Sequence, residues 1–472
     1  MKVTYIGHAS ILIEVDGITI LSDPWWRGPC FGAQWWIHPA PFLEALKDIQ
    51  VNYIYISHGH HDHFHPGTLK TFDRSTKILA SNQTGIAEAV REIGFEVIGF
   101  EGQEEVALTE KVRIRIIPTH SDDTLMTVTD GFETCVNAND ALHSAPLSVQ
   151  DTFMVQLKSI FPRIDYLFCG YGVASHFPNC YEIPGKDRAL TASHRQQYFN
   201  RQWVRIVNGI QPRFGFPFAA DVVFLENDLF WVNEPIHNTE RPTDVYRNLH
   251  PSSVVEVIDI APGFNIENGK VINEKLRTPV SSDALSKSCA DSIIRANRYG
   301  SVSEDDIRQL IELLQANVKV CKKYLLSFDG NWRFLIRLRN SDLGIVLEKS
   351  AATIEIRQVR LQGEEDVQEK GKYDLTYKVR PAYLKLSLTQ PYGDEILFVG
   401  SGGIFKYASR ETAKTNLHRE LMTILKKHVH EPKSRYGDQP KLMYKVKQTL
   451  KKWLGRNEPD LYDISSWSVF CK

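Results

Sequence analysis

The sequence predicts an α/β or layered α+β sandwich protein with a second, smaller α+β domain. Short apolar strands alternate with helices through the first half of the chain. A loop with five histidines follows one of these strands, and around residue 275 the pattern changes to polar-faced helices and then to alternating strands. At 472 residues, two or three domains are expected.

The first half divides into short elements. The opening "VTYIGHASILIEVDGITILSDPWW" predicts two strands about an Asp16–Gly17 turn. Further strands are predicted at "VNYIYIS", "STKILAS", "EVIGF", "VRIRIIPT", "LMTVTD", "TCVNAND" and "RIDYLFCGYG", and a single strand at "RFGFPFAADVVF". Helices are predicted at "GIAEAVREIG" and at "TASHRQQYFNRQWVRIVNGIQP", the second closed by Gly209.

Four regions follow from these patterns. We expect a metal-binding domain over residues 1–275, a helical connector over 276–322 and a small α+β domain over 323–408. The remainder, 409–472, is predicted as a helical basic tail. Its segment "KLMYKVKQTLKKWLGR" is amphipathic, and a docked surface helix is favoured over membrane-surface contact.

Composition limits the function. The 56 basic and 57 acidic residues give a formal net charge of -1, which argues against nucleic acid or an anionic membrane as a bulk partner. The seven cysteines include no CxxC pair, so reduced thiols are expected. With no signal-peptide pattern and no run near the ~20 apolar residues of a membrane span, we expect a cytoplasmic protein without a membrane span.

The stretch "YIYISHGHHDHFHP" carries the chemistry. His58, His60, Asp62 and His63 form an H-x-H-x-D-H motif directly after a buried strand. Loop residues two apart can point the same way, so His58 and His60 can hold one metal ion while Asp62 and His63 turn toward a second. Imidazoles and a carboxylate suit Zn, Mn or Fe.

The motif resembles the signature of the metallo-β-lactamase fold, which implies an αββα sandwich with strand-end loops around one or two metal ions. "GHASILIEVDGITILSDPWW" resembles the branch that includes L-ascorbate-6-phosphate lactonase. The likeness is closer to the metallo-β-lactamase-like part of CMP-N-acetylneuraminate hydroxylase. It rests on "ILSDPWWRGPCFGAQWW", "YIYISHGHHDHFHPGTLK" and "IQPRFGFPFA", and covers roughly residues 1–260.

The resemblance implies further ligands. His120 in "IIPTHSDD" and Asp140 in "CVNAND" fall at the family's third-motif histidine and bridging carboxylate. Where the family usually has a last histidine, this chain has none, and Glu226 takes the position. Glu226 is either a ligand, which would favour Fe or Mn over Zn, or an exposed turn residue.

The resemblance also assigns supporting roles. His8 and Asp23 would orient the ligands; read alone, they are a hydrogen-bonded core histidine and a turn cap. His176 lies in a glycine-rich loop similar to the family's substrate-side loop and is a catalytic candidate beside Asp62. Residues 323–407 faintly resemble the sterol-carrier-like fold.

Three functions remain open at this point. The first is a di-iron oxygenase or hydroxylase that acts on a small molecule. The hydroxylase family carries a Rieske domain with C-x-H and C-x-x-H pairs, which this sequence lacks, so electrons would come from a separate electron donor or from the substrate itself. The second is a dinuclear hydrolase of a lactone, ester or phosphoester, and the third is a non-catalytic metal-binding protein. The sequence does not indicate an oligomeric state.

Overall fold

The computed structural model describes residues 1–119, 122–172, 175–238, 240–298, 300–328, 330–361, 371–415 and 417–428. The chain divides into two compact units. The first comprises Met1–Ala174 and Ser193–Ile293, and the second comprises Ser175–Ala192 and Ile294–Lys472. His120 and residues 429–472 of the predicted basic tail lie outside the ranges that the structure describes.

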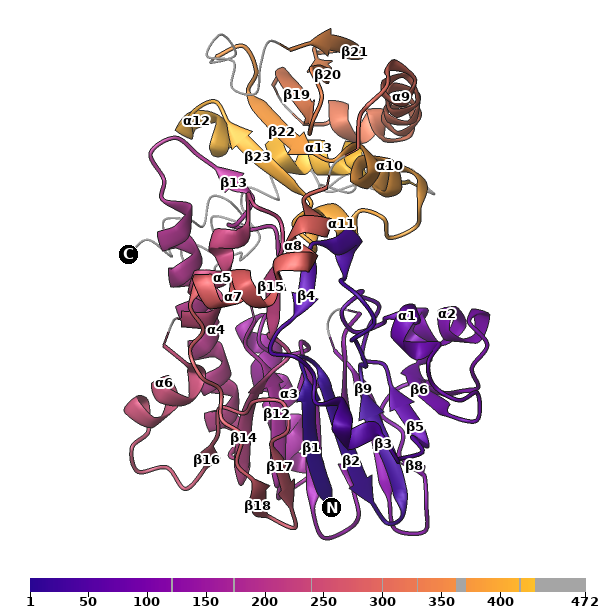
Figure 1. The fold of residues 1–472 in the computed structure, drawn as a ribbon, viewed down its shortest axis with the longest axis vertical. Helices are drawn as coiled ribbons and strands as arrows, with labels where there is room; N and C mark the ends of the chain where they lie inside the picture. Colours follow the sequence, from indigo (N-terminus) through magenta and orange to yellow (C-terminus); the bar gives the residue numbers. More distant parts are fainter. Residues whose placement is uncertain are drawn as a thin grey trace. The chain divides into compact units, whose positions relative to one another are not determined.

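The first unit contains two large sheets (Figure 1). The described residues of one sheet form eight strands in the order β18-β17-β1-β2-β3-β5-β6-β7. Strands β3, β5, β6 and β7 run parallel to one another, and the other neighbours are antiparallel. The strands are β1 (Lys2–Gly7), β2 (Ser10–Val15), β3 (Ile18–Ser22), β5 (Tyr53–Tyr55), β6 (Lys77–Ser81), β7 (Val97–Phe100), β17 (Asn265–Glu267) and β18 (Lys270–Asn273).

The second sheet has seven described strands in the order β16-β14-β12-β11-β10-β9-β8. Strands β11, β12, β14 and β16 are parallel. The strands are β8 (Val106–Ala107), β9 (Arg113–Pro118), β10 (Thr124–Thr129), β11 (Thr134–Asn139), β12 (Tyr166–Gly170), β14 (Phe214–Phe218) and β16 (Glu256–Val257). A separate small sheet pairs β4 (Trp35–Ile37) with β15 (Val222–Phe224).

Apolar side chains from the two sheets form the central core of the first unit, for example Tyr5, Ile116 and Phe168. Helices cover the outer faces. Residues of α1 (Pro66–Leu69) and α2 (Ile86–Glu92) pack on the first sheet, and residues of α3 (Leu147–Ile160), α4 (Arg188–Ile210) and α6 (Pro242–Leu249) pack on the second. Figure 1 shows α1 and α2 on one side of the sandwich and α4 on the other. The predicted αββα sandwich is confirmed.

Shorter helices complete this unit. They are η1 (Phe31–Ala33), η2 (Leu43–Leu46), η3 (Asn82–Thr84), η4 (Phe230–Val232), α5 (Asn233–Asn238), α7 (Ser282–Ser288) and α8 (Ala290–Ala296), which crosses into the second unit.

The N-terminal prediction of two strands is wrong, because the chain folds back twice. β1 ends at Gly7, β2 begins at Ser10, and the two strands pair antiparallel. The reversal depends on His8, whose φ is 48°, a left-handed conformation that is uncommon for a non-glycine residue. The turn places His8 at the end of a strand.

Two predictions around α4 also fail. The helix continues past Gly209 to Ile210, and Gln211 with φ 56° takes the left-handed conformation that ends it. Gly209 instead allows close packing, since a Cβ there would overlap the sulfur of Met154. The strand predicted over residues 213–224 is two strands, β14 and β15, in different sheets, separated by Ala219 with φ 54°.

The described residues of the second unit form a six-stranded sheet in the order β13-β23-β22-β19-β20-β21. Helices α9, α10 and α13 pack against one another, and α9 packs on β20 and β21. The strands are β13 (Tyr181–Glu182), β19 (Trp332–Leu338), β20 (Leu343–Lys349), β21 (Ile354–Arg360), β22 (Leu375–Val379) and β23 (Gly403–Tyr407). The helices are α9 (Glu304–Leu326), α10 (Pro381–Thr389), α11 (Glu395–Phe398), α12 (Arg410–Ala413) and α13 (Leu417–Leu425).

The edge strand β13 comes from residues 175–192, which are far from the rest of the second unit in sequence. Tyr181 pairs with Phe405 in a parallel register. The described part of the predicted tail, α12 and α13, is also integrated here, since Leu421 and Leu425 are fully buried.

Candidate metal centre

The predicted ligands of the first unit lie where strands end. Asp23 follows β3, residues 58–63 follow β5 and Asp140 follows β11, while His8 follows β1. In open sheets, sites form at the carboxyl ends of parallel strands. Here the two sheets contribute together, because Asp140 belongs to one sheet and the histidine loop to the other.

Three of these strand ends have left-handed backbone conformations. The φ values are 48° at His8, 34° at Asp23 and 48° at Asn139. Such conformations at non-glycine residues cost of order 1 kcal/mol or more and gather at functional sites. They turn each side chain out of its strand at the same edge of the sandwich.

Asp23 is fully buried and organises the centre. Its Oδ1 accepts from the backbone N–H of Ser57 (2.8 Å), and its Oδ2 accepts from Ser57 Oγ (2.7 Å) and Asn139 Nδ2 (2.8 Å). His63 Nδ1 lies 3.0 Å from the same Oδ2. A carboxylate can only accept, so His63 Nδ1 carries a proton and donates it to Asp23, which leaves Nε2 as the nitrogen that could bind a metal ion.

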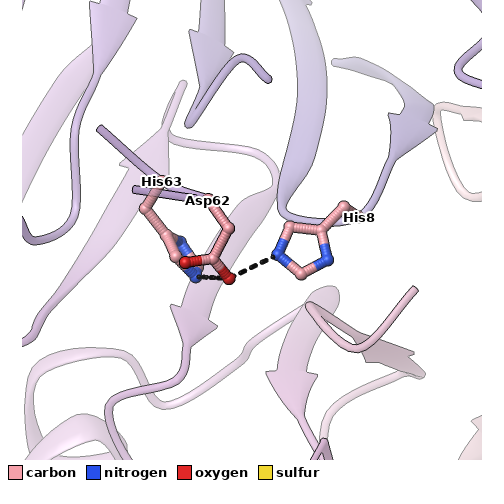
Figure 2. Close-up of side chains that lie close together, drawn as sticks. All are labelled: His8, Asp62 and His63. Carbon is pink, nitrogen blue, oxygen red and sulfur yellow. Dashed lines mark hydrogen bonds and ion pairs between the residues drawn. The ribbon is translucent and has the colours of Figure 1, made fainter. Parts of the chain in front are cut away.

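His8, Asp62 and His63 form the first cluster of candidate ligands (Figure 2). Asp62 Oδ2 lies 3.1 Å from His8 Nε2 and 3.4 Å from His63 Nε2. All three residues are buried. The His8 ring also contacts Trp25 edge-on, with ring centroids 5.3 Å apart.

His58, His63 and Asp140 form the second cluster. Asp140 Oδ2 lies 3.5 Å from His63 Nε2, and the His58 and His63 rings are 4.1 Å apart. His60 joins through its Nδ1, 2.8 Å from His58 Nε2. His63 is common to both clusters, so a carboxylate of each cluster lies within 3.5 Å of its Nε2.

Protonation follows these contacts. Burial and the neighbouring His58 lower the pKa of His60 to about 4. Burial would raise the pKa of Asp62, but His63 and His8 hold it well below its ordinary range. The pKa of Asp140 is lowered in the same way, against burial, by His63. Burial would lower the pKa of His63, yet Asp62, Asp140 and Asp23 raise it well above its ordinary range. The same carboxylates that hold a proton on His63 would also stabilise a bound metal cation.

The donor set fits a metal ion. Among the described residues, His8 Nδ1, Asp62 Oδ1, His63 Nε2 and Asp140 Oδ1 are buried atoms without a hydrogen-bond partner. Buried polar atoms in that state are costly. The ligand atoms of each cluster lie within 4.8 Å of one another, near the separation of up to about 4.4 Å that two bonds of about 2.2 Å allow. A small inward shift of the side chains would bring the ligand atoms of either cluster to metal-binding distances.

Other predicted residues are not brought to these clusters. Glu226 is buried two residues after β15 and, within the described residues, belongs to neither cluster. His176 belongs to the second unit. There its Nδ1 lies 2.5 Å from the carbonyl oxygen of Phe398, and its ring packs near Tyr181 and Phe405. The roles of Glu226, His176 and His120 stay predictions.

The sequence analysis missed four residues of the centre. Ser57 and Asn139 hold Asp23, and Asp123 Oδ1 lies 3.6 Å from His58 Nδ1. His143 is buried and its Nε2 lies 2.9 Å from the carbonyl oxygen of Gly172. Ser57 and Asn139 are direct neighbours of the predicted ligands His58 and Asp140, which is the signal that could have found them.

Residues 2–133 match the β-lactamase superfamily domain. The first unit has the metallo-β-lactamase fold, and the candidate ligands above gather at its strand ends.

Its relatives include the protein named cytidine monophosphate-N-acetylneuraminic acid hydroxylase of Pan troglodytes. That protein is 26% identical over 297 residues, which cover 58% of this chain and 47% of the relative. A protein of Mycobacterium tuberculosis named as a Rieske 2Fe-2S iron-sulfur protein is 28% identical over 251 residues, 50% of this chain and 46% of the relative. The chain thus spans about half the length of the curated relatives it matches. The lactonase likeness stays a prediction.

Among solved structures, the metallo hydrolase Igni18 of Ignicoccus hospitalis is similar, with 18% identity and a TM-score of 0.38 over 58% of this chain and 99% of that protein. Each helix in the described part of the chain is too short or too polar to cross a bilayer.

Proposed function

We propose that this protein is a dinuclear-metal oxygenase that hydroxylates a small-molecule metabolite, with iron as its native metal. The observation that carries the proposal is the pair of carboxylates near His63 Nε2, at 3.4 Å for Asp62 and 3.5 Å for Asp140. Carboxylates are hard donors, and they favour iron or manganese, whereas sulfur-rich donor sets favour zinc. The names of the hydroxylase and Rieske relatives point the same way.

His58, His60, Asp62, His63 and Asp140 would hold the two ions, with His120 and Glu226 as further ligands. Bound iron would supply the redox chemistry that activates dioxygen. The chain itself orients the ligands and excludes bulk water from them. Asp23 fixes the direction of His63 Nε2, and His58, Asp62 and His63 are nearly or fully shut off from bulk water.

Asp62 and His8 can move a proton. Asp62 Oδ2 and His8 Nε2 are 3.1 Å apart, so a proton taken up by the carboxylate can pass to the imidazole. The six described cysteines are free and buried, which suits the reducing compartment of the cytoplasm. We further propose a separate protein as electron donor.

The test begins with metal analysis of the full chain purified without oxygen. We expect about two iron ions per chain, and oxygen uptake when the reduced, iron-loaded protein is mixed with air-saturated buffer. Uptake should fall to the buffer rate in protein stripped of metal. Zinc or manganese in place of iron, with no oxygen uptake after iron loading, would contradict the proposal.

A metal-dependent hydrolase is the second candidate, and the Asp62–His8 contact favours it equally well. In that reaction Asp62 would orient and deprotonate the attacking water and His8 would receive the proton. Cleavage of a lactone, ester or phosphoester by the zinc- or manganese-loaded protein without oxygen would establish this reading.

A further inference from the structure

The second unit contains a cavity of about 320 Å³ beside α9 and α10, two helices that lie side by side (Figure 1). The charged side chains that line it, among the described residues, are Arg298, Arg339, Arg380, Lys385 and Asp306. Four basic groups thus face one carboxylate. The rest of the wall combines the polar Ser301 and Gln309 with apolar residues and Tyr383.

Two of these cations are deep in the protein. Arg339 is 6% exposed and Arg380 is 9% exposed, and arginine is rarely buried to this degree. Arg298 and Lys385 are exposed. Two buried arginines and two exposed cations therefore line the cavity.

Neighbouring groups hold the basic side chains in place. Arg380 donates to the carbonyl oxygen of Ala296, and its guanidinium lies 5.0 Å from the centre of the Tyr383 ring. Lys385 Nζ is 3.0 Å from Gln309 Oε1 on α9. Held in this way, the cations lose little additional freedom when a ligand binds.

The start of α10 adds to the same field. Arg380 is the N-cap residue of this nine-residue helix, and its side chain makes no capping hydrogen bond. Pro381, Ala382 and Tyr383 of the first turn line the cavity. The positive end of the helix dipole thus reinforces the arginines and favours an anion.

We propose that this cavity binds the phosphate group of a small phosphate monoester. Four cationic side chains and one carboxylate line the cavity, which suits an anionic group, and a phosphate dianion carries more charge to meet the cations than a single carboxylate does. Arginine also matches phosphate through paired N–H donors. The volume lies at the lower end of the range for small-molecule sites, about 300–1,000 Å³, so the rest of the ligand is small and would lie on the apolar wall. The site is independent of the proposed function of the metal centre.

The experiment measures binding of glycerol 3-phosphate and of inorganic phosphate to the full chain by calorimetry at low ionic strength. We expect saturable binding that weakens as salt is added. Arg298→Gln combined with Lys385→Gln should weaken it about tenfold or more, and both positions are exposed, so folding should be unaffected. Arg308→Gln, an exposed arginine of α9 paired with Asp305, is the matched control and should bind within about twofold of the unaltered chain.

Phosphate could also bind at the metal centre, so each titration is repeated with Asp140→Asn. Equal binding by that variant supports the cavity as the site, and loss of binding there overturns the proposal. It is also overturned if the double variant binds like the control. Vesicles containing phosphatidic acid form the last arm, because a lipid headgroup carries the same phosphate chemistry. Binding to vesicles without saturable binding of glycerol 3-phosphate would overturn the small-ligand proposal.

Discussion

The two units gather charge in different ways. In the first unit, the metal centre combines a contiguous loop, residues 58–63, with the ends of β3 and β11, and its charges are carboxylates around imidazoles. In the second unit, the basic cavity draws on Arg298, Arg339 and Lys385 from three separate segments. A site on strand ends is fixed by backbone geometry, whereas the basic cavity depends on long side chains held by their neighbours.

The same contrast bears on specificity. The metal centre offers small, rigid donors a few ångströms apart, which select an ion by geometry. The cavity offers long cationic side chains, which select a ligand by charge and by paired hydrogen bonds. Substitution of a ligand at the candidate metal centre should abolish metal binding, whereas substitution of a cation in the basic cavity should weaken anion binding in steps.

The largest effect is expected for Asp140→Asn. The substitution keeps the size of the side chain but removes the charge beside His63 Nε2, so the protein should fold yet fail to hold a second metal ion. Activity should fall more than about 100-fold, since ligands matter more than the groups that orient them. Metal content and circular dichroism measure this together. Asp48→Asn, an exposed carboxylate, should leave both unchanged, and full dinuclear occupancy in Asp140→Asn would contradict a bridging role.

A smaller loss is expected for Asp23→Asn. Asp23 touches no metal position directly and acts by holding His63 Nδ1 and Ser57. An amide there would place N–H donors against N–H donors, which should release the His63 ring. Metal affinity should drop about 10- to 100-fold, measured by competition with a chelator. Asp16→Asn at an exposed turn is the control, and unchanged affinity in Asp23→Asn would show that His63 is held by other contacts.

The parts of the molecule that sequence could predict are those with local signals. Apolar strands that alternate with helices predict a layered sandwich, and the resemblance of the H-x-H-x-D-H loop to the metallo-β-lactamase signature implies the αββα order. The reversal at His8 could not be predicted, because it depends on a left-handed histidine that propensity disfavours. The transfer of residues 175–192 to the second unit could not be predicted either, since the two-residue strand β13 pairs with β23, which is more than 200 residues away in sequence.

The basic cavity was missed for a similar reason. Its arginines and lysine are spread from residue 298 to residue 385, and each alone is indistinguishable from a solvated surface cation. Burial of Arg339 and Arg380 appears only in three dimensions.

Acid should destabilise the first unit through His237, a buried histidine that belongs to neither ligand cluster. Arg277 Nη2 lies 2.8 Å from its Nδ1, and its Nε2 lies 2.9 Å from the carbonyl oxygen of Val222. Burial and the nearby His38 lower its pKa to about 4. The unfolded chain takes up a proton near pH 6.5 and the folded chain only near pH 4, so stability falls as the pH drops across this window.

The cost should approach about 3 kcal/mol by pH 4. Chemical unfolding of metal-free protein, followed from pH 7 to pH 4, measures it. In His237→Gln the amide can replace both hydrogen bonds without titrating, so the loss of stability on acidification should be smaller by that amount. Identical pH profiles for the two proteins would show that His237 does not contribute.

The smallest effect concerns Asp306, the carboxylate among the charged groups of the basic cavity, and it rests on the proposed phosphate site. Ser303 donates to Asp306 Oδ2 from its backbone N–H (3.0 Å) and its hydroxyl (2.6 Å), and these bonds lower the pKa of Asp306. Asp306 is therefore ionised at neutral pH and repels a phosphate. Asp306→Asn keeps an oxygen for the Ser303 N–H and removes the repulsion, so glycerol 3-phosphate should bind about two- to threefold more tightly at low salt. Asp305→Asn changes the net charge equally on the same helical turn but does not line the cavity. Equal affinities in these two variants would mean that net charge, and not the cavity, governs binding of phosphate.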